Sequence, residues 1–337
     1  MLSKKQVDRA GDTLRSDKIS ASDALIAKMD AINILSQWRA RHVYPLNLAF
    51  NLLKRYTDKI GNNAIYGQRL KRVTSVIHKL KRMPETKLSR LQDIGGCRVI
   101  LSDYERLRNL THSLAKSKSI LDNYKDYITY PKPDGYRSVH FIYECNSSNT
   151  EFDKLKIEIQ LRTKLQHAWA TTVEIIDSFE NQGIKLGGGS DDWRRFFYLV
   201  ADEFARLEKL PFHDNVTTQA ERIAEIIQLA SNLNVIFKLE QYSKIIDNMS
   251  KLDKFERIRY FIIVLKAKDS RTDIFGYFDD VEAENNYKQM EKSNLENPDV
   301  NIVLVKADSL KKIKQAYPNY FADSRKFVSS LELILSK

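Results

Sequence analysis

The sequence predicts an α/β (α+β) fold in which helices flank a mixed β-sheet, followed by a smaller C-terminal α/β module. Three segments carry the strand prediction. Residues 97–102 are apolar and β-branched, whereas residues 137–145 and 154–162 alternate polar and apolar side chains. Apolar residues spaced three and four apart predict helices around them. Strands and helices that alternate in this way pack as layers over one core.

The helical segments surround the expected strands. The spacing predicts helices within residues 21–60, over roughly 103–119 and from about Thr163 onward, and a long helical region after the glycine-containing loop at 181–192. The stretch 69–90 is expected to be a basic helix followed by a turn. The 181–192 loop lacks the GK[ST] sequence of a phosphate-binding loop, so it is interpreted as a plain connection.

The C-terminal part has its own pattern of strands and helices. Residues 260–267 and 301–307 predict strands, and residues 281–295 and 308–337 predict helices, in a module that begins between about 215 and 255. The segment 317–327 holds four aromatic residues around a turn. Such a cluster either forms a local core or docks onto a nucleotide site or a partner.

The overall charge is strongly positive. The chain of 337 residues carries a formal net charge of +11. Such a surface attracts polyanions such as nucleotides, RNA or ribosomes, although a solvated lysine-rich surface gives the same total. The first residues form no apolar signal segment, and no stretch has the length of a membrane span, so we expect a cytoplasmic protein without a membrane partner. Cys97 and Cys145 form no CxxC pair, which argues against a zinc site.

Polar side chains line one face of the strand at 154–162. A period of two places Lys156, Glu158, Gln160 and Arg162 together, opposite an apolar face. This pattern alone is also typical of a half-buried strand with a solvated face. The turn at 131–140, however, adds a second group of polar and aromatic residues just before it in the sequence.

Cations and one carboxylate form a third group. Arg69, Arg72, Lys79 and Arg82 recur on the expected basic helix in a pattern that can grip a triphosphate. Asp93 lies just before a strand, where a carboxylate can hold Mg²⁺. The simpler interpretations are a solvated helix face and a turn-forming aspartate.

Together these three groups resemble the synthetase domain of the RelA/SpoT family, whose members make the alarmones pppGpp and ppGpp. The resemblance extends over roughly residues 65–175. The family string D-I-x-G-x-R stands here at 93–98, the loop K-D-Y…P-K-x-N-G-Y-x-S-x-H at 125–140, and the strand E-x-Q-x-R-T at 158–163. Asp134 replaces the asparagine that the family often has, and the turn tolerates either residue.

The resemblance implies a role for each matched residue. Arg69 and Arg98 match the pair that sandwiches the adenine of ATP, and Lys71 and Lys79 match phosphate contacts. Asp93 and Glu158 match the Mg²⁺ carboxylates, with Mn²⁺ as a possible substitute, and Glu158 also matches the group that takes the proton from the attacking hydroxyl. The residues that match the acceptor site are Lys125, Lys132, Tyr136, His140, Gln160 and Arg162.

The family also implies a fold and a reaction. The expected fold is a nucleotidyltransferase-like domain at 65–214, with packed helices at 1–64. The module at 215–337 has no counterpart in this resemblance, and because its polar residues lack the spacing of a catalytic set, we expect it to regulate the synthetase. In the expected reaction, a 3′-hydroxyl of GDP or GTP attacks the β-phosphorus of ATP and AMP leaves. Long members also carry an N-terminal hydrolase built on His and His-Asp motifs. The lone His213-Asp214 pair does not match these motifs and is expected to lie in a loop.

Two alternatives to this reaction concern the acceptor and the role of the chain. A toxic relative would instead modify the 3′ end of tRNA or an adenine nucleotide, which also suits the positive charge, and its C-terminal module would act as a brake or sensor. A catalytically inactive relative would only bind or regulate, but Asp93, Tyr136 and Glu158 are all present. A protein partner at the C-terminal module and a homo-oligomer are further expectations.

Overall fold

The computed structural model describes most of the chain. Its described residues are 2–16, 22–61, 63–121, 124–180, 182–184, 187–213, 217–246, 258–266, 268–269, 271–294, 297, 299–306, 310–321 and 323–336. Statements about the structure below refer to these ranges.

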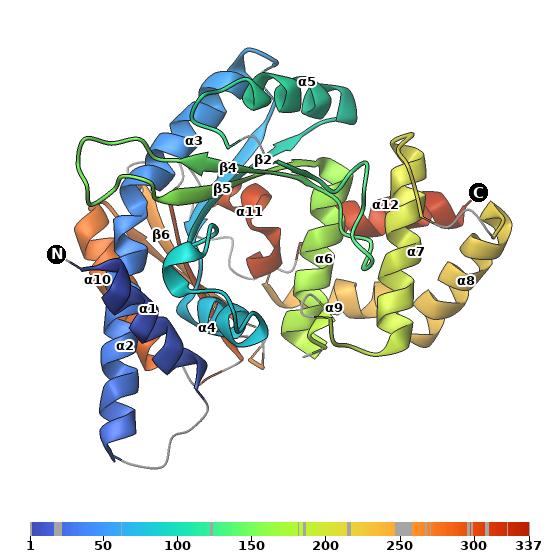
Figure 1. Cartoon of the computed structure of the whole chain (residues 1–337). Coiled ribbons are helices and arrows are strands. Elements are labelled where there is room, and N and C mark those ends of the chain that lie inside the picture. The colour runs from blue at the N-terminus through green and yellow to red at the C-terminus, as the bar shows by residue number, and fades with distance from the viewer. Residues whose placement is uncertain are drawn as a thin grey trace.

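A five-stranded mixed sheet forms the centre of the molecule (Figure 1). Its order is β1-β2-β5-β4-β3, in which β2 and β5 run parallel and the other neighbours run antiparallel. The strands are β1 (Ile65–Leu70), β2 (Gly95–Leu101), β3 (Lys125–Asp126), β4 (Val139–Glu144) and β5 (Lys156–Thr163). The sheet confirms the predicted mixed fold class and the three predicted strands, and it adds the two edge strands β1 and β3.

One of these edge strands corrects the sequence prediction. Arg69 lies on β1, not on a basic helix, because residues 65–70 pair with β2 along the edge of the sheet. The helix starts only at Val73, as α4 (Val73–Arg82). Arg69 therefore does not share a helix with Lys79 and Arg82. The short strand has polar residues on both faces, so its sequence carries little alternation that could distinguish it from a helix.

Helices cover one face of this sheet. The two that pack on β2 and β5 are α3 (Val43–Asp58) and α5 (Tyr104–Ala115). Their apolar side chains meet Ile157, Ile159 and Leu161 of β5, which are completely buried. Two N-terminal helices, α1 (Lys4–Arg15) and α2 (Ser22–Arg41), form a second apolar cluster with α4. The opposite face of the sheet, which bears Glu158, remains available for a site.

A further group of helices follows the sheet. The helices are α6 (Lys164–Glu180), α7 (Asp191–Leu207), α8 (Gln219–Asn232), α9 (Val235–Ile246) and the C-terminal α12 (Arg325–Leu335). One apolar cluster includes residues from all five of them and also from the second sheet. The expected division at 214/215 lies outside the described residues, and the apolar packing continues from one side of it to the other.

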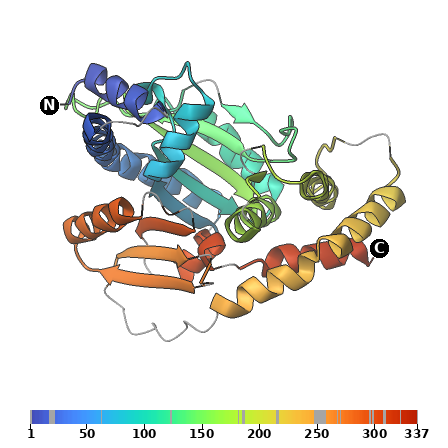
Figure 2. The ribbon, with the colours of Figure 1, turned by 90° about the horizontal axis from the view of Figure 1, so that it is seen from below.

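The C-terminal module contains a three-stranded antiparallel sheet of order β7-β6-β8. Its elements are β6 (Tyr260–Lys266), β7 (Arg271–Tyr277), α10 (Asp280–Ser293), β8 (Val300–Lys306), α11 (Leu310–Ala316) and the 3-10 turn η4 (Pro318–Phe321). Figure 2 shows this sheet beside the rest of the molecule, and β8 and α11 both pack against β1. The strand β7 was not predicted, because this edge strand is largely exposed and lacks apolar alternation. Residues 308–337, expected to be helical, form α11 and α12 with the turn η4 between them.

None of the described helices has both the length and the apolar character that a membrane-spanning helix requires.

Glu208, just after α7, has an unusual environment. Burial raises the pKa of its carboxyl group to about 7, and Gln166 Nε2 lies 3.5 Å from its Oε2. Because the pKa is higher in the folded than in the unfolded chain, the folded state is favoured while this group is protonated. That contribution is complete below about pH 4.5 and is lost as the pH rises through about 7.

We therefore expect Glu208→Gln to stabilise the protein more at pH 8 than at pH 5, by up to about 3 kcal/mol. Thermal unfolding of the wild type and the variant at both pH values measures this difference. The exposed Glu332→Gln serves as the control. Equal shifts in Tm at the two pH values for Glu208→Gln would contradict the assignment.

Candidate functional site

The strand register builds two rows of side chains across the exposed face of the sheet. In one row Arg69, Gly96 and Glu158 lie opposite one another on β1, β2 and β5. Gly96 has no side chain, so it leaves space between the guanidinium of Arg69 and the carboxylate of Glu158. In the next row Arg98, Gln160 and His140 are neighbours on β2, β5 and β4, and Lys125 follows on β3 at the exposed rim.

The carboxylate of Glu158 is held from both sides. His140 Nδ1 lies 3.0 Å from its Oε1, and Gln160 Nε2 donates a hydrogen bond of 2.6 Å to its Oε2. Burial alone would raise the pKa of Glu158, but the contacts with His140 and Gln160 outweigh it and hold the pKa far below its ordinary value. Glu158 is therefore an ionised carboxylate with a fixed orientation at neutral pH.

A second carboxylate, Asp93, lies between two lysines. Lys71 Nζ and Lys79 Nζ each lie 2.7 Å from its Oδ2. Burial opposes ionisation, yet the two ammonium groups prevail and the pKa of Asp93 is lowered. Its other oxygen, Oδ1, is buried without a hydrogen-bond partner among the described residues. The sequence predicted these three residues separately, and the fold brings them into one cluster.

The turn at 131–136 presents an aromatic side chain surrounded by cations. Arg162 Nη2 donates a hydrogen bond of 2.9 Å to the Tyr136 hydroxyl, and His140 Nε2 lies 2.8 Å from the same oxygen. Lys132 Nζ and Arg162 Cζ lie 4.8 and 5.2 Å from the centre of the ring. Burial lowers the pKa of Lys132. Asp134 Oδ1 accepts a 3.0 Å hydrogen bond from the backbone N–H of Tyr136, so aspartate serves in this turn as predicted.

The C-terminal module covers the two arginines that the resemblance assigns to adenine. Arg98 Nη2 donates to the Ala316 carbonyl over 2.5 Å, and Arg98 Cζ lies 4.7 Å from the centre of the Tyr317 ring. The Tyr317 hydroxyl donates to the Gln68 carbonyl over 2.6 Å, and Arg69 Nη1 lies 3.5 Å from the Tyr320 hydroxyl. An aromatic ring from the module thus occupies a face of Arg98 on which a base could stack.

A buried ion pair joins the same module to the N-terminal helices. Arg39 Nη1 on α2 lies 2.6 Å from Glu291 Oε2 on α10, and Arg39 Nη2 donates to the Tyr287 hydroxyl over 3.0 Å. The other oxygen of Glu291 accepts a 2.9 Å hydrogen bond from the N–H of Val73, the first residue of α4. The N-cap residue Arg72 makes no side-chain cap, so Glu291 takes over that function.

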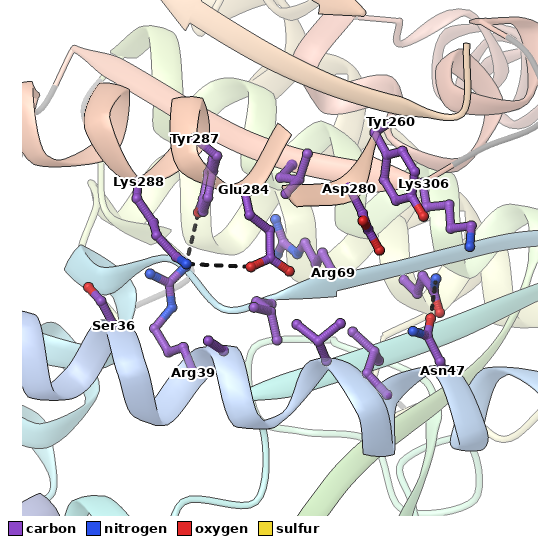
Figure 3. Close-up of a pocket in the computed structure, with 16 residues that line it drawn as sticks. Ser36, Arg39, Asn47, Arg69, Tyr260, Asp280, Glu284, Tyr287, Lys288 and Lys306 are labelled. Carbon is purple, nitrogen blue, oxygen red and sulfur yellow. Dashed lines mark hydrogen bonds and ion pairs between the residues drawn. The ribbon is translucent and has the colours of Figure 1, made fainter. Parts of the chain in front are cut away.

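Next to this ion pair, the interface encloses a cavity of about 100 Å³ (Figure 3). Arg39 on α2 and Asn47 on α3 approach it from one side, and Glu284 and Tyr287 approach it from α10 on the other. Arg69 also lines it. The interface is therefore closely packed around Arg98 and more open towards α10.

Most predicted site residues meet on the face described above, but the sequence missed the residues that cover it. Tyr320 and Arg69 are 251 positions apart, and Arg39 and Glu291 are 252 positions apart. The four aromatics at 317–327 were the available signal for such a contact. His213 was expected to lie in a loop, and it does lie outside the helices, between α7 and α8. There its imidazole contacts Asp202 and the Pro131 carbonyl. Asp214 lies outside the described residues.

The described residues hold no cluster of three or more His, Cys, Asp or Glu side chains around a possible metal position. Asp93, just before β2, nevertheless offers a buried oxygen without a hydrogen-bond partner among the described residues, and Glu158 on β5 is ionised. Carboxylate oxygens suit Mg²⁺, which often takes only one or two of them and completes its shell with water and phosphate. The two residues therefore fit the predicted metal.

Comparisons with known proteins find similarity over the region that contains most of these residues. Residues 68–177 match the family described as the region found in RelA/SpoT proteins. The GTP pyrophosphokinases YwaC and YjbM of Bacillus subtilis are each 32% identical to this chain, over 136 and 125 residues. These alignments cover 37% and 35% of this chain, and the chain spans only 65% and 58% of the length of the two relatives. A crystal structure of the small alarmone synthetase 1 from Bacillus subtilis, bound to its product pppGpp, aligns with 52% of this chain and 94% of that one at 23% identity and a TM-score of 0.42.

Proposed function

We propose that this chain is a RelA/SpoT family member through residues 68–177, and that it transfers the β,γ-pyrophosphate of ATP to the 3′-hydroxyl of GDP or GTP and releases AMP. The observation that carries this proposal is the arrangement of the sheet face. Cations for a polyphosphate lie on the β1–β2 side, an aromatic platform lies on the β4 side, and the ionised Glu158 lies between them. The relatives named above as GTP pyrophosphokinases support the guanine nucleotide.

The residues of the chain mainly position and neutralise in this reaction. Arg69 and Arg98 would hold the adenine, and Lys71 and Lys79 would hold the phosphates of ATP. Glu158 would accept the proton of the attacking hydroxyl, and its contacts with His140 and Gln160 fix the direction of its lone pairs. In phosphoryl transfer, such positioning and charge stabilisation supply most of the rate enhancement.

Asp93 and Glu158 would hold Mg²⁺ or Mn²⁺, which would neutralise phosphate charge when bound. Lys71 and Lys79 form ion pairs with Asp93. A cation held by Asp93 would leave both lysines available for the phosphates of ATP.

The acceptor site is suited to a base that is followed by phosphates. Tyr136 offers an aromatic surface, and Lys132 and Arg162 lie within reach of negative charge beside it. The rim residue Lys125 extends this positive surface. Stacking tolerates every base, so guanine, adenine and the terminal adenosine of tRNA all suit the platform.

We propose that the C-terminal module is a brake on this activity. Tyr317 stacks on Arg98, and the Tyr320 hydroxyl lies beside Arg69, where the adenine of ATP would be held. The tyrosines and ATP therefore compete for the same two guanidinium groups. In the closed state the tyrosines cover the two arginines, and only the open fraction of the molecules binds ATP. The apparent Kd for ATP is then the intrinsic Kd divided by that open fraction.

This covering favours a second candidate function. An enzyme that is restrained by its own C-terminus suits a product that arrests growth, such as tRNA blocked at its 3′ end or a pyrophosphorylated adenine nucleotide. A protein partner that binds the module and opens it would then switch the activity on. Incubation of the purified chain with labelled ATP and, in turn, GDP, GTP, ADP, ATP alone or bulk tRNA distinguishes these acceptors.

The brake predicts that Tyr317→Ala in the full-length chain raises the rate of AMP release at low ATP by about tenfold or more. The change should appear in the KM for ATP, because the ring that competes with adenine is lost. Tyr317→Phe keeps the ring but loses the hydrogen bond to Gln68, so a smaller increase is expected. Phe321→Leu, a buried position in the same turn, is the matched control. A rate that is unchanged by Tyr317→Ala would rule out the brake.

The catalytic proposal predicts that Glu158→Gln and Asp93→Asn each reduce transfer at least a hundredfold, because each removes a charge at the metal with little change in volume. Both substitutions are made in the Tyr317→Ala background, where ATP has access. Circular dichroism and thermal unfolding confirm the fold. More than a tenth of the parent activity in either variant is incompatible with the proposed mechanism.

The acceptor assignment predicts that Tyr136→Ala impairs acceptor use by tenfold to about a hundredfold, since stacking on an aromatic contributes on the order of 1–3 kcal/mol. Steady-state kinetics with varied acceptor and with varied ATP separate the two sites. Tyr136→Phe is the control that retains the ring but loses the contacts with Arg162 and His140. Unchanged acceptor kinetics in Tyr136→Ala would show that the ring only packs.

A further inference from the structure

We propose that Asp202 on α7, together with His213, positions the acceptor-binding loop for catalysis. Neither residue belongs to the region matched by the family. The inference rests on the proposed function, because it assigns a task to residues around the loop 131–136 that carries Tyr136. Arg137, Asp202 and His213 are called the loop clamp below.

The clamp ties both ends of the loop to one carboxylate. At one end, Arg137 Nη2 donates a hydrogen bond of 2.7 Å to Asp202 Oδ1. At the other, His213 Nε2 lies 3.4 Å from the Pro131 carbonyl, while His213 Nδ1 lies 3.2 Å from Asp202 Oδ1. The backbone N–H of His213 also donates to Asp202 Oδ2 over 3.0 Å. Asp202 is completely buried and Arg137 is 4% exposed, so bulk water does not screen the pair.

Close packing adds to these polar contacts. Gly135 has a φ of +89°, and a Cβ at this position would lie 2.8 Å from the Cβ of Ala201 and 3.3 Å from the Cα of Tyr198 on α7. The loop backbone thus rests directly on the helix that carries Asp202. The ring of Tyr198 stacks on the ring of His213 at a centroid distance of 5.3 Å, which holds the imidazole in place.

The clamp bears on catalysis because Tyr136 and Arg137 are adjacent in the chain. Arg137 is anchored in α7, while Tyr136 is held by Arg162 and His140 on the sheet. Movement of either anchor would displace the aromatic platform relative to Glu158, and a displacement of about 1 Å can cost a hundredfold in rate. The proposed ATP contacts lie on the other side of β5, on β1, β2 and α4. Loss of the clamp should therefore affect the acceptor and spare ATP.

A buried ion pair can also act on stability alone, and removal of one partner destabilises a fold in any case. The neighbouring residue provides a matched control. Glu203 is 1% exposed, and its Oε1 accepts a 2.9 Å hydrogen bond from Arg222 Nε. Its other polar partners among the described residues, Arg206 and Gln219, also lie outside the loop 131–136. Glu203→Gln thus removes a buried, paired carboxylate from the same helix.

The experiment compares Asp202→Asn, His213→Phe and Glu203→Gln in the full-length chain with Tyr317→Ala as the common parent. Initial rates of AMP release are measured with varied acceptor and with varied ATP, and thermal unfolding is measured for each variant. We expect Asp202→Asn and His213→Phe to raise the KM for the acceptor about tenfold and to leave the KM for ATP within twofold. Glu203→Gln should lower Tm without a change in the acceptor KM. His213→Phe retains the stacking ring and decides the question if Asp202→Asn does not fold.

An unchanged acceptor KM in His213→Phe, or an equal rise in Glu203→Gln, would overturn the clamp while the proposed function stands, since the parent still transfers. A parallel rise in the KM for ATP would also overturn it, because the clamp would then act only through general stability. If the parent transfers pyrophosphate to none of GDP, GTP, ADP, ATP or tRNA, the proposed function fails and the clamp fails with it.

Discussion

The position of β5 between a parallel and an antiparallel neighbour is the constraint on which the rest of the molecule depends. Its apolar side chains enter the core under α3 and α5, which fixes its register because a slip of one residue would reverse both faces. The same burial therefore orients Glu158, Gln160 and Arg162 on the opposite face. Arg98 and His140 fall into line with Gln160 only because β2 and β4 flank β5 on its two sides.

Electrostatic balance shapes the site that this register creates. The face gathers several cations, and each buried carboxylate is compensated by them or by hydrogen bonds: Asp93 by two lysines and Glu158 by His140 and Gln160. Burial, together with the neighbouring positive charges of Arg162 and Arg69, lowers the pKa of Arg98 to about 10. Such a site is electrostatically suited to a polyanion, and the C-terminal module supplies a carbonyl and an aromatic ring to Arg98.

The C-terminal module is joined to the rest of the chain in two different ways. Apolar residues of its sheet and of α12 join the cluster formed by α6 and α7, which is the main source of burial. Polar contacts at Arg39, Arg69 and Arg98 depend on geometry and desolvation. The apolar contacts suit a permanent attachment. The polar contacts instead cover Arg69 and Arg98, which hold the adenine of ATP in the proposed function. A module attached in this way can uncover the site through a local rearrangement, without separation from the chain.

The sequence alone determined the parts that are local or periodic. Alternation over 137–145 and 154–162 predicted β4 and β5 and the shared face of Glu158, Gln160 and Arg162. The motif strings and the basic segment after residue 68 supplied the other candidate site residues. The sequence could not determine β1 and β7, since these edge strands are only partly buried and show little alternation, so Arg69 was first placed on a helix. The tertiary structure alone decided which residues far apart in the chain meet: Tyr317 on Arg98, Glu291 on Arg39 and His213 on Asp202. A single sequence does not show which distant residue a tyrosine or a glutamate contacts. Such contacts arise from the packing of whole helices and strands, and not from the periodic spacing of residues within one of them.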